Sequence, residues 1–456
     1  MIINDVLETK NESILFVGRS GNYESFTFDG FLLKLSESGA FIDSLNYLKQ
    51  DTSTNIVNIL ETDYSDTLYN LSISFKKNNN SGFILVNTDT MFNMANEKIY
   101  NLPINDIITT LTLINGNDGK LIVGGSFKNT QIHYYLFIYK FSNSFDSIAA
   151  KHFINTPSII LGGIHELNDQ SFWIIDGTSP YYWHIDSGLN LISSQAGNVP
   201  HYLTGNYSIK WDSDTSFLLA GDYYVRGLPR ITDHDIGFFH QYTPFDSTGN
   251  IFNWWGTIDT LDAPAYFGAL DYKNKDSIFI GGSKNLQYGN QLFGTIPSWY
   301  VLLQTDSMLN IRWERFYGGD ACYNMTKLIA TNDGGCIMAG TRFDYKAHPN
   351  IRERDIYIVK VNAEGLITSA NGQIAPVVHE AIVYPNPGRD YLRVRVGVQH
   401  KQSVFKLFDM TGHLVLTKNI EGKTAKINTR FLQPGTYIYT ITNNNGLTEN
   451  GKWVKE

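Results

Sequence analysis

The segment "ITDHDIGFFH" holds a dense group of side chains that could bind a metal ion. Asp233, His234, Asp235 and His240 carry the oxygen and nitrogen atoms that coordinate divalent cations. Asp235, however, begins a strand-like stretch with counterparts elsewhere in the chain, "DGFLLKL" and "DIYIVKV". An aspartate at such a position commonly accepts hydrogen bonds from turn amides. We therefore predict no metal site and no cofactor, with a divalent cation as the alternative for this cluster.

Sequence motifs of nucleophilic, metal-dependent and nucleotide-dependent catalysis are missing. The chain contains no G-x-S-x-G, no H-E-x-x-H and no Walker loop. Two facing carboxylates can still hydrolyse a glycosidic bond, and Asp and Glu occur in many predicted loops. We therefore predict a non-enzymatic protein that binds a glycan or a protein, and we name no catalytic residue. The alternative is a surface polysaccharide hydrolase.

Three aromatic clusters, "PYYWH", "DYYVRG" and "NWWG", could serve such a binding role. Trp183, Trp254 and Trp255 offer ring faces of the kind that stack on sugars. The alternative is packing between sheets, which we favour. Neighbouring residues of a strand face opposite sides, so Trp254 and Trp255 cannot both point toward one ligand.

The elements that position these residues are predicted to be strands. The 456 residues are 42% hydrophobic and 18% charged, enough to bury a large core in two or more domains. Glycine (39), tyrosine (27) and phenylalanine (27) are abundant, which favours short strands and tight turns and hence an all-β fold. A net charge of −8 without basic clusters disfavours nucleic acid as a partner. No apolar run approaches the ~20 residues of a transmembrane segment.

Two further features concern export and oxidation. The first residues, "MIINDVLETKNESILFVG", are interrupted by charges, so we expect no signal peptide within this chain. Cys322 and Cys336 are the only cysteines. We expect buried free thiols, with a disulfide between neighbouring strands as the alternative.

A hairpin pattern recurs along residues 1–368. "DVLETKNESILFVGRS" and "KLIATNDGGCIMAGTR" share a strand, a polar turn, a second strand and a glycine that ends the unit. Further copies span residues 113–126, 168–179, 212–223 and 274–284, and a weaker copy spans 79–89. The unit-ending positions are Gly18, Asn87, Gly125, Gly177, Gly221, Gly282 and Gly340.

Units spaced by roughly 40 to 70 residues suit four-stranded blades with variable loops. A third strand led by aspartate and a fourth such as "NIRWERFYGG" would complete each blade. We predict a seven-bladed β-propeller over residues 1–368; eight blades or two β-sandwiches are the alternatives. We also expect residues 366–370 to pair with residues 14–17 and so close the ring. The segments "TNDGGCIMAGT" and "WERFYGGD" resemble secreted bacterial propeller-like repeats, which implies a fold and no activity.

The pattern changes at residue 381, after a predicted linker over residues 369–380. "YLRVRV" alternates apolar and charged residues, the pattern of a strand with one face buried and one in water. "SVFKLFDMTGHLVLTK" and "LQPGTYIYTITNNNGLTENGKWVKE" each combine strands with tight turns. The prolines of "YPNP" remove backbone donors and force extended geometry on the residues before them. We predict a small immunoglobulin-like β-sandwich over residues 381–456.

The order of "YPNP", "LFDMTGHLV", "LQPGTYIYTIT" and "GKWVKE" resembles the C-terminal sorting domain of the type IX secretion system, type A. The residues that carry the resemblance are Tyr384, Pro385, Asn386, Pro387, Gly412, Pro434, Gly435, Tyr437 and Lys452. The resemblance implies a bacterium of the Bacteroidota, with the type IX machinery as partner. It also implies passage through the periplasm and across the outer membrane, removal of the sorting domain, and release or surface attachment. The alternative is a generic immunoglobulin-like domain that packs on the propeller.

A triplet of Asp, then Ser or Thr, then an apolar residue or Thr occurs eight times. It resembles the O-glycosylation sequon of periplasmic Bacteroidota proteins, which implies glycans on its hydroxyls. The alternative is turn chemistry, because Asp-Ser commonly leads into a strand. The candidate sites are Ser44, Thr67, Thr90, Ser147, Ser247, Thr260, Ser277 and Ser307.

Overall fold

The computed structural model describes residues 1–22, 27–62, 65–78, 80–102, 108–128, 134–153, 160–177, 181–196, 203–223, 235–241, 250–257, 260–347, 353–368 and 378–456. Within these residues the regular structure is almost entirely β-strand, with one short 3₁₀ helix, η1 (Val398–His400). The prediction of an all-β fold is confirmed.

In the described part of residues 1–368, consecutive strands form seven antiparallel sheets, and the first five are four-stranded. The first sheet contains β1 (Ile2–Glu8), β2 (Ile14–Asn22), β3 (Thr27–Leu35) and β4 (Phe41–Tyr47). The second contains β5 (Ser53–Thr62), β6 (Ser65–Lys77), β7 (Asn80–Asp89) and β8 (Met94–Asn101). The third contains β9 (Ile108–Asn115), β10 (Leu121–Lys128), β11 (Tyr134–Phe141) and β12 (Ser147–Phe153).

The fourth and fifth sheets repeat this order, whereas the sixth and seventh depart from it. The fourth contains β13 (Leu161–Glu166), β14 (Phe172–Asp176), β15 (Tyr181–Ile185) and β16 (Leu191–Ala196), and the fifth contains β17 (Leu203–Trp211), β18 (Phe217–Tyr223), β19 (Asp235–Gln241) and β20 (Ile251–Trp255). In the sixth, β21 (Leu261–Pro264) and β22 (Leu270–Asn274) both pair with β23 (Ser277–Leu286), followed by β24 (Trp299–Thr305) and β25 (Ile311–Gly318). The seventh contains β26 (Cys322–Ala330), β27 (Cys336–Phe343) and β28 (Asp355–Val361).

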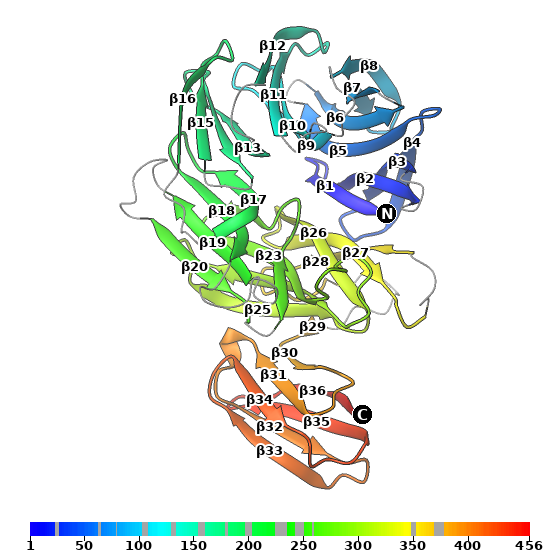
Figure 1. Ribbon diagram of the computed structural model, residues 1–456, viewed down its shortest axis with the longest axis vertical. Coiled ribbons are helices and arrows are strands. Elements are labelled where there is room, and N and C mark those ends of the chain that lie inside the picture. Colours follow the sequence, from blue (N-terminus) through cyan, green and yellow to red (C-terminus); the bar gives the residue numbers. More distant parts are fainter. Residues whose placement is uncertain are drawn as a thin grey trace.

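The sheets follow one another around a propeller-like ring (Figure 1). Their first strands contact each other in the order β1, β5, β9, β13, β17, β22 and β26, and β26 returns to β1. Hydrophobic clusters fill the intervals between neighbouring sheets. The middle strands are therefore covered on both faces. This explains why all seven residues of β24 are buried and why its sequence does not alternate between apolar and polar residues.

The predicted hairpins largely match the observed strands. Six of the units lie at the turn between the first and second strands of a sheet. The weaker copy at residues 79–89 was placed wrongly, because it falls on β7, the third strand of the second sheet. Asn87 pairs there with Asn70 of β6 and is no counterpart of the unit-ending glycines. A polar turn followed by a buried strand occurs more than once in each sheet, so this pattern alone does not number the strands.

Glycine is required where the first strand of a sheet bulges toward the second. The register between β1 and β2 shifts between Ile3 and Asp5, and that between β26 and β27 shifts between Met325 and Lys327. A Cβ atom at Gly18 would lie 1.9 Å from the carbonyl oxygen of Ile2. At Gly340 it would lie 2.1 Å from that of Asn324. The recurring glycine thus permits a backbone approach that any side chain would block.

The expected strand exchange at the ring closure is wrong. Ile367 pairs with Val361 of the neighbouring β28, and the Thr368 amide donates to the carbonyl of Lys360 over 3.3 Å. The first sheet already has four strands from residues 2–47, because β1 begins the chain as a first strand. Side chains close the ring instead: Ile3 and Phe16 pack with residues of β27 in one hydrophobic cluster.

Residues 381–456 form two sheets that share one hydrophobic core. The first contains β30 (Ala381–Tyr384), β31 (Tyr391–Val396) and β34 (Thr424–Asn428). The second contains β33 (Leu414–Ile420), β32 (Ser403–Phe408), β35 (Gly435–Asn443) and β36 (Gly446–Lys455). Before them, β29 (Val378–His379) pairs with β25 and so joins the sixth sheet of the ring.

The outer face of β31 does not lie in water as expected. Leu392, Val394 and Val396 enter the shared core, but Arg393 and Arg395 are only 8% and 1% exposed. Arg395 forms an ion pair with Glu314 of β25 over 3.1 Å. Figure 1 shows this C-terminal unit beside β25 and β29, which explains the burial. An alternating strand can therefore be covered on both faces when a neighbouring domain packs on it.

Candidate functional site

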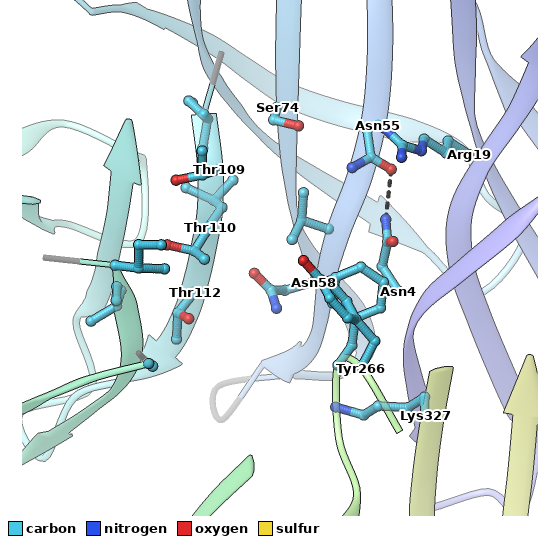
Figure 2. A pocket seen from close by; sticks show the side chains of 18 residues that line it. Asn4, Arg19, Asn55, Asn58, Ser74, Thr109, Thr110, Thr112, Tyr266 and Lys327 are labelled. Atoms are coloured by element: carbon cyan, nitrogen blue, oxygen red, sulfur yellow. Dashed lines mark hydrogen bonds between the residues drawn. The ribbon is translucent and has the colours of Figure 1, made fainter. Parts of the chain in front are cut away.

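A cavity of about 370 Å³ lies where first strands from several sheets approach one another (Figure 2). Amide and hydroxyl side chains form part of its lining, beside aliphatic residues and two cations. Asn4 comes from β1, Asn55 and Asn58 from β5, and Thr110 and Thr112 from β9. Asn4 Nδ2 donates to Asn55 Oδ1 over 2.6 Å and to the carbonyl of Ile56 over 2.7 Å, so the first and second sheets are joined at the cavity wall. Such groups can exchange hydrogen bonds with a polar ligand.

Two cations lie in the wall of this cavity and differ in their surroundings. Lys327 Nζ lies 2.9 Å from a carboxylate oxygen of Asp5, which balances its charge. Arg19 stacks on Phe28, with Cζ 4.6 Å from the ring centroid. Its Nε is buried without a hydrogen-bond partner, and within the described residues it forms no ion pair. Arg19 is therefore the cation with capacity for a further partner.

An aromatic pair forms part of the cavity rim. Tyr266 and Phe267 are 61% and 40% exposed, and their ring centroids lie 4.7 Å apart in an edge-to-face arrangement. They occupy residues 265–269, which interrupt the first strand of the sixth sheet between β21 and β22. The Phe267 amide donates to the carbonyl of Thr326 over 2.7 Å, and the Ala265 amide to that of Gly281 over 3.1 Å. These bonds hold the two rings in place.

Sequence reasoning missed this pair. The segment "LDAPAYFGALDY" places Pro264 and Gly268 on either side of the aromatics, and both residues interrupt a strand pattern. That interruption could have indicated exposed rings. The cavity itself could not be predicted from the sequence, because residues as far apart in the chain as Asn4 and Lys327 meet only once the ring has formed.

The three tryptophans proposed from the sequence lie elsewhere. Trp183 is 1% exposed and packs edge-on against Phe153, with 5.7 Å between centroids. Trp255 is also 1% exposed, and its Nε1 donates to Glu314. Neither ring offers a free face to a ligand. Trp254, on the outer strand β20, is 40% exposed but does not line the cavity.

The histidine cluster is divided by the structure. Asp233 and His234 lie outside the described residues, while Asp235 and His240 are buried in β19. The Nε2 atom of His240 lies 2.9 Å from Asp212 and 3.1 Å from Ser216. Both partners contact the same nitrogen, so the imidazole cannot pass a proton from one to the other. Burial lowers the pKa of His240, an effect that the charge of Asp212 opposes.

Equivalent contacts in other sheets indicate a structural role for His240. In the fourth sheet the pair is Ser171 and His184, 2.9 Å apart. In the seventh it is Lys360 and Asp333, also 2.9 Å apart. Each contact joins the third strand to the turn between the first and second strands. Within the described residues, no three His, Cys, Asp or Glu side chains lie close enough to hold a metal ion.

The candidate glycosylation sites differ in exposure. Ser44 and Ser147 are exposed on the outer strands β4 and β12, and Thr90, Ser277 and Ser307 are half-buried. Thr260 is 6% exposed and donates to Asp262 over 2.9 Å, so its hydroxyl has no room for a glycan. The side chains of Thr67 and Ser247 lie outside the described residues.

The aspartates of two triplets contribute to tight turns. Asp89 Oδ1 accepts the amides of Met91 and Asn93 over 2.8 and 2.9 Å. Hydrogen bonds from the side chain and backbone of Asn93 lower the pKa of Asp89. Asp306 accepts the corresponding amides of Met308 and Asn310, each over 2.9 Å. Turn chemistry accounts for the aspartate in both triplets.

Cys322 and Cys336 are buried free thiols, as expected. Burial raises the pKa of each thiol. A thiol with a raised pKa is largely protonated at neutral pH and is a weak nucleophile. Neither cysteine lines the cavity.

The motif residues of the C-terminal unit hold its two ends together. Asn386 Nδ2 donates to the carbonyl of Lys452 over 2.7 Å, and its Oδ1 accepts the amide of Val454 over 2.9 Å. Trp453 Nε1 donates to the carbonyl of Pro385 over 2.8 Å. The "YPNP" segment is thereby fixed to the last strand, β36.

Two turns of this unit use the remaining motif residues. Tyr437 donates from its hydroxyl to the carbonyl of Gln433 over 2.8 Å, across the Pro434-Gly435 turn. Gly412 has a φ of 86° at the turn between β32 and β33, where its amide donates to the carbonyl of Asp409. A positive φ at that point favours glycine. In the described part of the chain no helix has the length and hydrophobicity of a membrane span.

Comparisons with solved structures find distant similarities over large parts of the chain. No curated protein matches the chain in sequence. Among solved structures, PorZ of Porphyromonas gingivalis, an essential bacterial surface component of the type IX secretion system, is 10% identical with a TM-score of 0.29 over 100% of this chain and 81% of its own. A Bacteroides caccae protein of unknown function is 13% identical, with a TM-score of 0.38 over 66% and 92%. YCF48 of Cyanidioschyzon merolae is 9% identical, with a TM-score of 0.44 over 80% and 96%.

The C-terminal unit, by contrast, matches a family by its sequence. Residues 382–456 fit the family model described as the secretion system C-terminal sorting domain. The match begins at the second residue of β30 and includes every motif residue named above. A sorting domain of this kind implies export of the chain that carries it. Residues 382–456 are therefore a C-terminal sorting domain of the type IX secretion system.

Proposed function

We propose that this protein is exported by the type IX secretion system and binds a glycan or protein at the cavity without catalysing a reaction. In this proposal residues 1–368 form a seven-bladed β-propeller, residues 369–380 a linker, and residues 381–456 an immunoglobulin-like sandwich. The cyclic order of first-strand contacts supports the propeller. The shared core of two facing sheets supports the sandwich.

The lining of the cavity is the observation that carries the binding role. Amides, hydroxyls, Arg19, Lys327, two exposed rings and five aliphatic side chains line it, and none of its described lining residues is Asp or Glu. Glycoside hydrolysis generally requires two carboxyl groups about 5 to 10 Å apart on either side of the bond. The lack of Asp and Glu among the described lining residues favours binding over that reaction. The volume also falls within the ~300–1,000 Å³ that small-molecule sites occupy.

The sorting domain supports the route of export. We propose passage through the periplasm to the outer surface of a Bacteroidota cell, followed by release or surface attachment. The type IX machinery is then the partner of residues 382–456, and the external ligand is the partner of the ring. The two partners would meet different parts of the chain.

A glycan array probed with the full chain tests the binding role. We expect binding to at least one glycan without release of reducing ends from it. The double variant Y266A/F267A should lose this binding, because both rings belong to the rim. Tyr288 is 59% exposed but does not line the cavity, so Y288A is the matched control and should bind normally. Cleavage of the bound glycan, or full binding by Y266A/F267A, would overturn the proposal.

A further inference from the structure

We infer that the ligand of the cavity is an acidic saccharide, whose uronic-acid carboxylate pairs with Arg19. This inference rests on the proposed binding role of the cavity and names the chemical class that fits it. It follows from three features of the wall: a cation with spare donors, hydroxyl and amide groups, and a fixed aromatic platform. Each feature matches a different part of one sugar residue.

Arg19 supplies the charge. Its guanidinium stacks on Phe28, while the buried Nε has no hydrogen-bond partner. The two terminal nitrogens of the guanidinium are not buried and have no hydrogen-bond partner among the described residues, so their N–H groups can donate to a bound carboxylate. The planar guanidinium fork matches a carboxylate in a bidentate arrangement. Because no described carboxylate pairs with Arg19, this position is open to an external one.

The ligand is expected to carry isolated negative charges and not a dense polyanion. Asp5 already pairs with Lys327, the second cation of the wall, and also accepts the Ile59 amide over 3.2 Å. One uncompensated cation suits one carboxylate. The net charge of −8 further disfavours a densely charged partner such as nucleic acid.

The amides and hydroxyls suit the sugar's own hydroxyls. Figure 2 shows Asn58 and Tyr266 projecting toward the open centre of the cavity. A polyhydroxylated ligand can exchange hydrogen bonds with such amide and hydroxyl groups, because its hydroxyls donate as well as accept. A purely apolar ligand would offer these groups no hydrogen-bond partner.

Tyr266 and Phe267 supply the platform for the ring of the sugar. Aromatic faces bury the apolar face of a pyranose and leave its hydroxyls free for polar contacts. Backbone hydrogen bonds from residues 265 and 267 fix the loop, so little ordering is needed on binding. Charge, hydroxyl recognition and stacking thus meet in one cavity.

Isothermal titration calorimetry with the full chain tests the inference. The probes are oligosaccharides of galacturonate, glucuronate and mannuronate, each beside its carboxyl-reduced neutral form. We expect at least one uronate to bind about tenfold more tightly than its neutral form, the effect of one charge-assisted hydrogen bond. R19Q should abolish this preference and R19K should restore part of it. R430Q, which removes an exposed arginine of the sorting domain, is the control and should leave the preference unchanged.

The outcomes separate the inference from the proposed function. Equal binding of acidic and neutral forms, or a preference unaffected by R19Q in a variant that unfolds at the wild-type temperature, overturns the acidic-saccharide inference. The binding role of the cavity then stands if Y266A/F267A still loses neutral sugars. Absence of binding to every probe overturns the inference, and a blank glycan array with it overturns saccharide binding altogether.

Discussion

At the scale of single residues, the buried ion pair of Arg395 and Glu314 joins the sorting domain to the ring. Both side chains are at most 1% exposed, and Arg395 Cζ also lies 4.4 Å from the centroid of Trp255. Trp255 Nε1 donates to the same carboxylate. Gln399 of η1 adds a pair of hydrogen bonds to the backbone of Glu314. A charged pair thus lies at the centre of the contact between the ring and the sorting domain.

The first prediction concerns the loss of one partner of this pair. In R395M, Glu314 stays buried without its cation, so the unfolding free energy should fall by about 3–5 kcal/mol. The double variant E314Q/R395M should recover part of the loss, because no buried charge remains. Urea-induced unfolding followed by tryptophan fluorescence measures both variants.

The control for R395M is R389Q, which removes a solvent-exposed ion pair of the sorting domain. Arg389 and Glu456 lie 3.1 Å apart with side chains that are 79% and 50% exposed. R389Q should change the unfolding free energy by less than about 1 kcal/mol. Equal losses of unfolding free energy in R395M and R389Q would contradict the view that burial makes the Arg395–Glu314 pair costly to break.

At the scale of elements, the bulged first strands determine where glycine is needed. A Cβ atom at Gly340 would lie 2.1 Å from the Asn324 carbonyl oxygen and 2.5 Å from the Tyr300 hydroxyl. One of these groups belongs to the backbone of β26 and cannot rotate away. The bulge and the glycine therefore depend on each other.

The second prediction follows from that contact. G340A should lower the unfolding free energy by about 1–3 kcal/mol, the usual cost of overpacking. Gly422 has open space around its Cβ position, so G422A is the matched control and should stay within about 0.5 kcal/mol. Thermal unfolding of both variants decides the matter. An unchanged unfolding free energy in G340A would show that the first strand can shift without cost.

The same elements show how far sequence reasoning reaches. The hairpins could be predicted because a strand, a turn and the next strand are adjacent in the chain. The ring closure could not, since Ile3 meets Ile337 only by packing, and the sequence pattern does not record such a contact. The burial of Arg395 was missed for the same reason. In the cavity, Tyr266 was missed because its loop lies between β21 and β22, before the repeat unit predicted at residues 274–284.

At the scale of the whole molecule, the ring and the sorting domain are joined over several kinds of contact. β29 extends the sixth sheet through Phe316 and Tyr317 of β25. Ile382 and Tyr384 belong to a hydrophobic cluster of the ring. The neighbouring Ala381 and Val383 belong to the core of the sorting domain. A single short strand, β30, thus contributes side chains to two hydrophobic cores.

The third prediction concerns export. In a host with a type IX system and with an added signal peptide, the full chain should reach the cell surface or the medium. A chain truncated after Gln373 lacks the matched residues 382–456 and should stay in the periplasm. Fractionation and immunoblotting measure the distribution. A host without the type IX system is the control, and unchanged display of the truncated chain would contradict the assignment.

The alternation of side chains along β30 has a mechanical consequence. A flexible tether lets the bodies at its two ends turn independently, whereas a strand with side chains in two cores transmits rotation and tension between them. The side chains of β30 thus couple the orientation of the sorting domain to that of the ring. A receptor that binds residues 382–456 would therefore also orient the ring and its cavity during export.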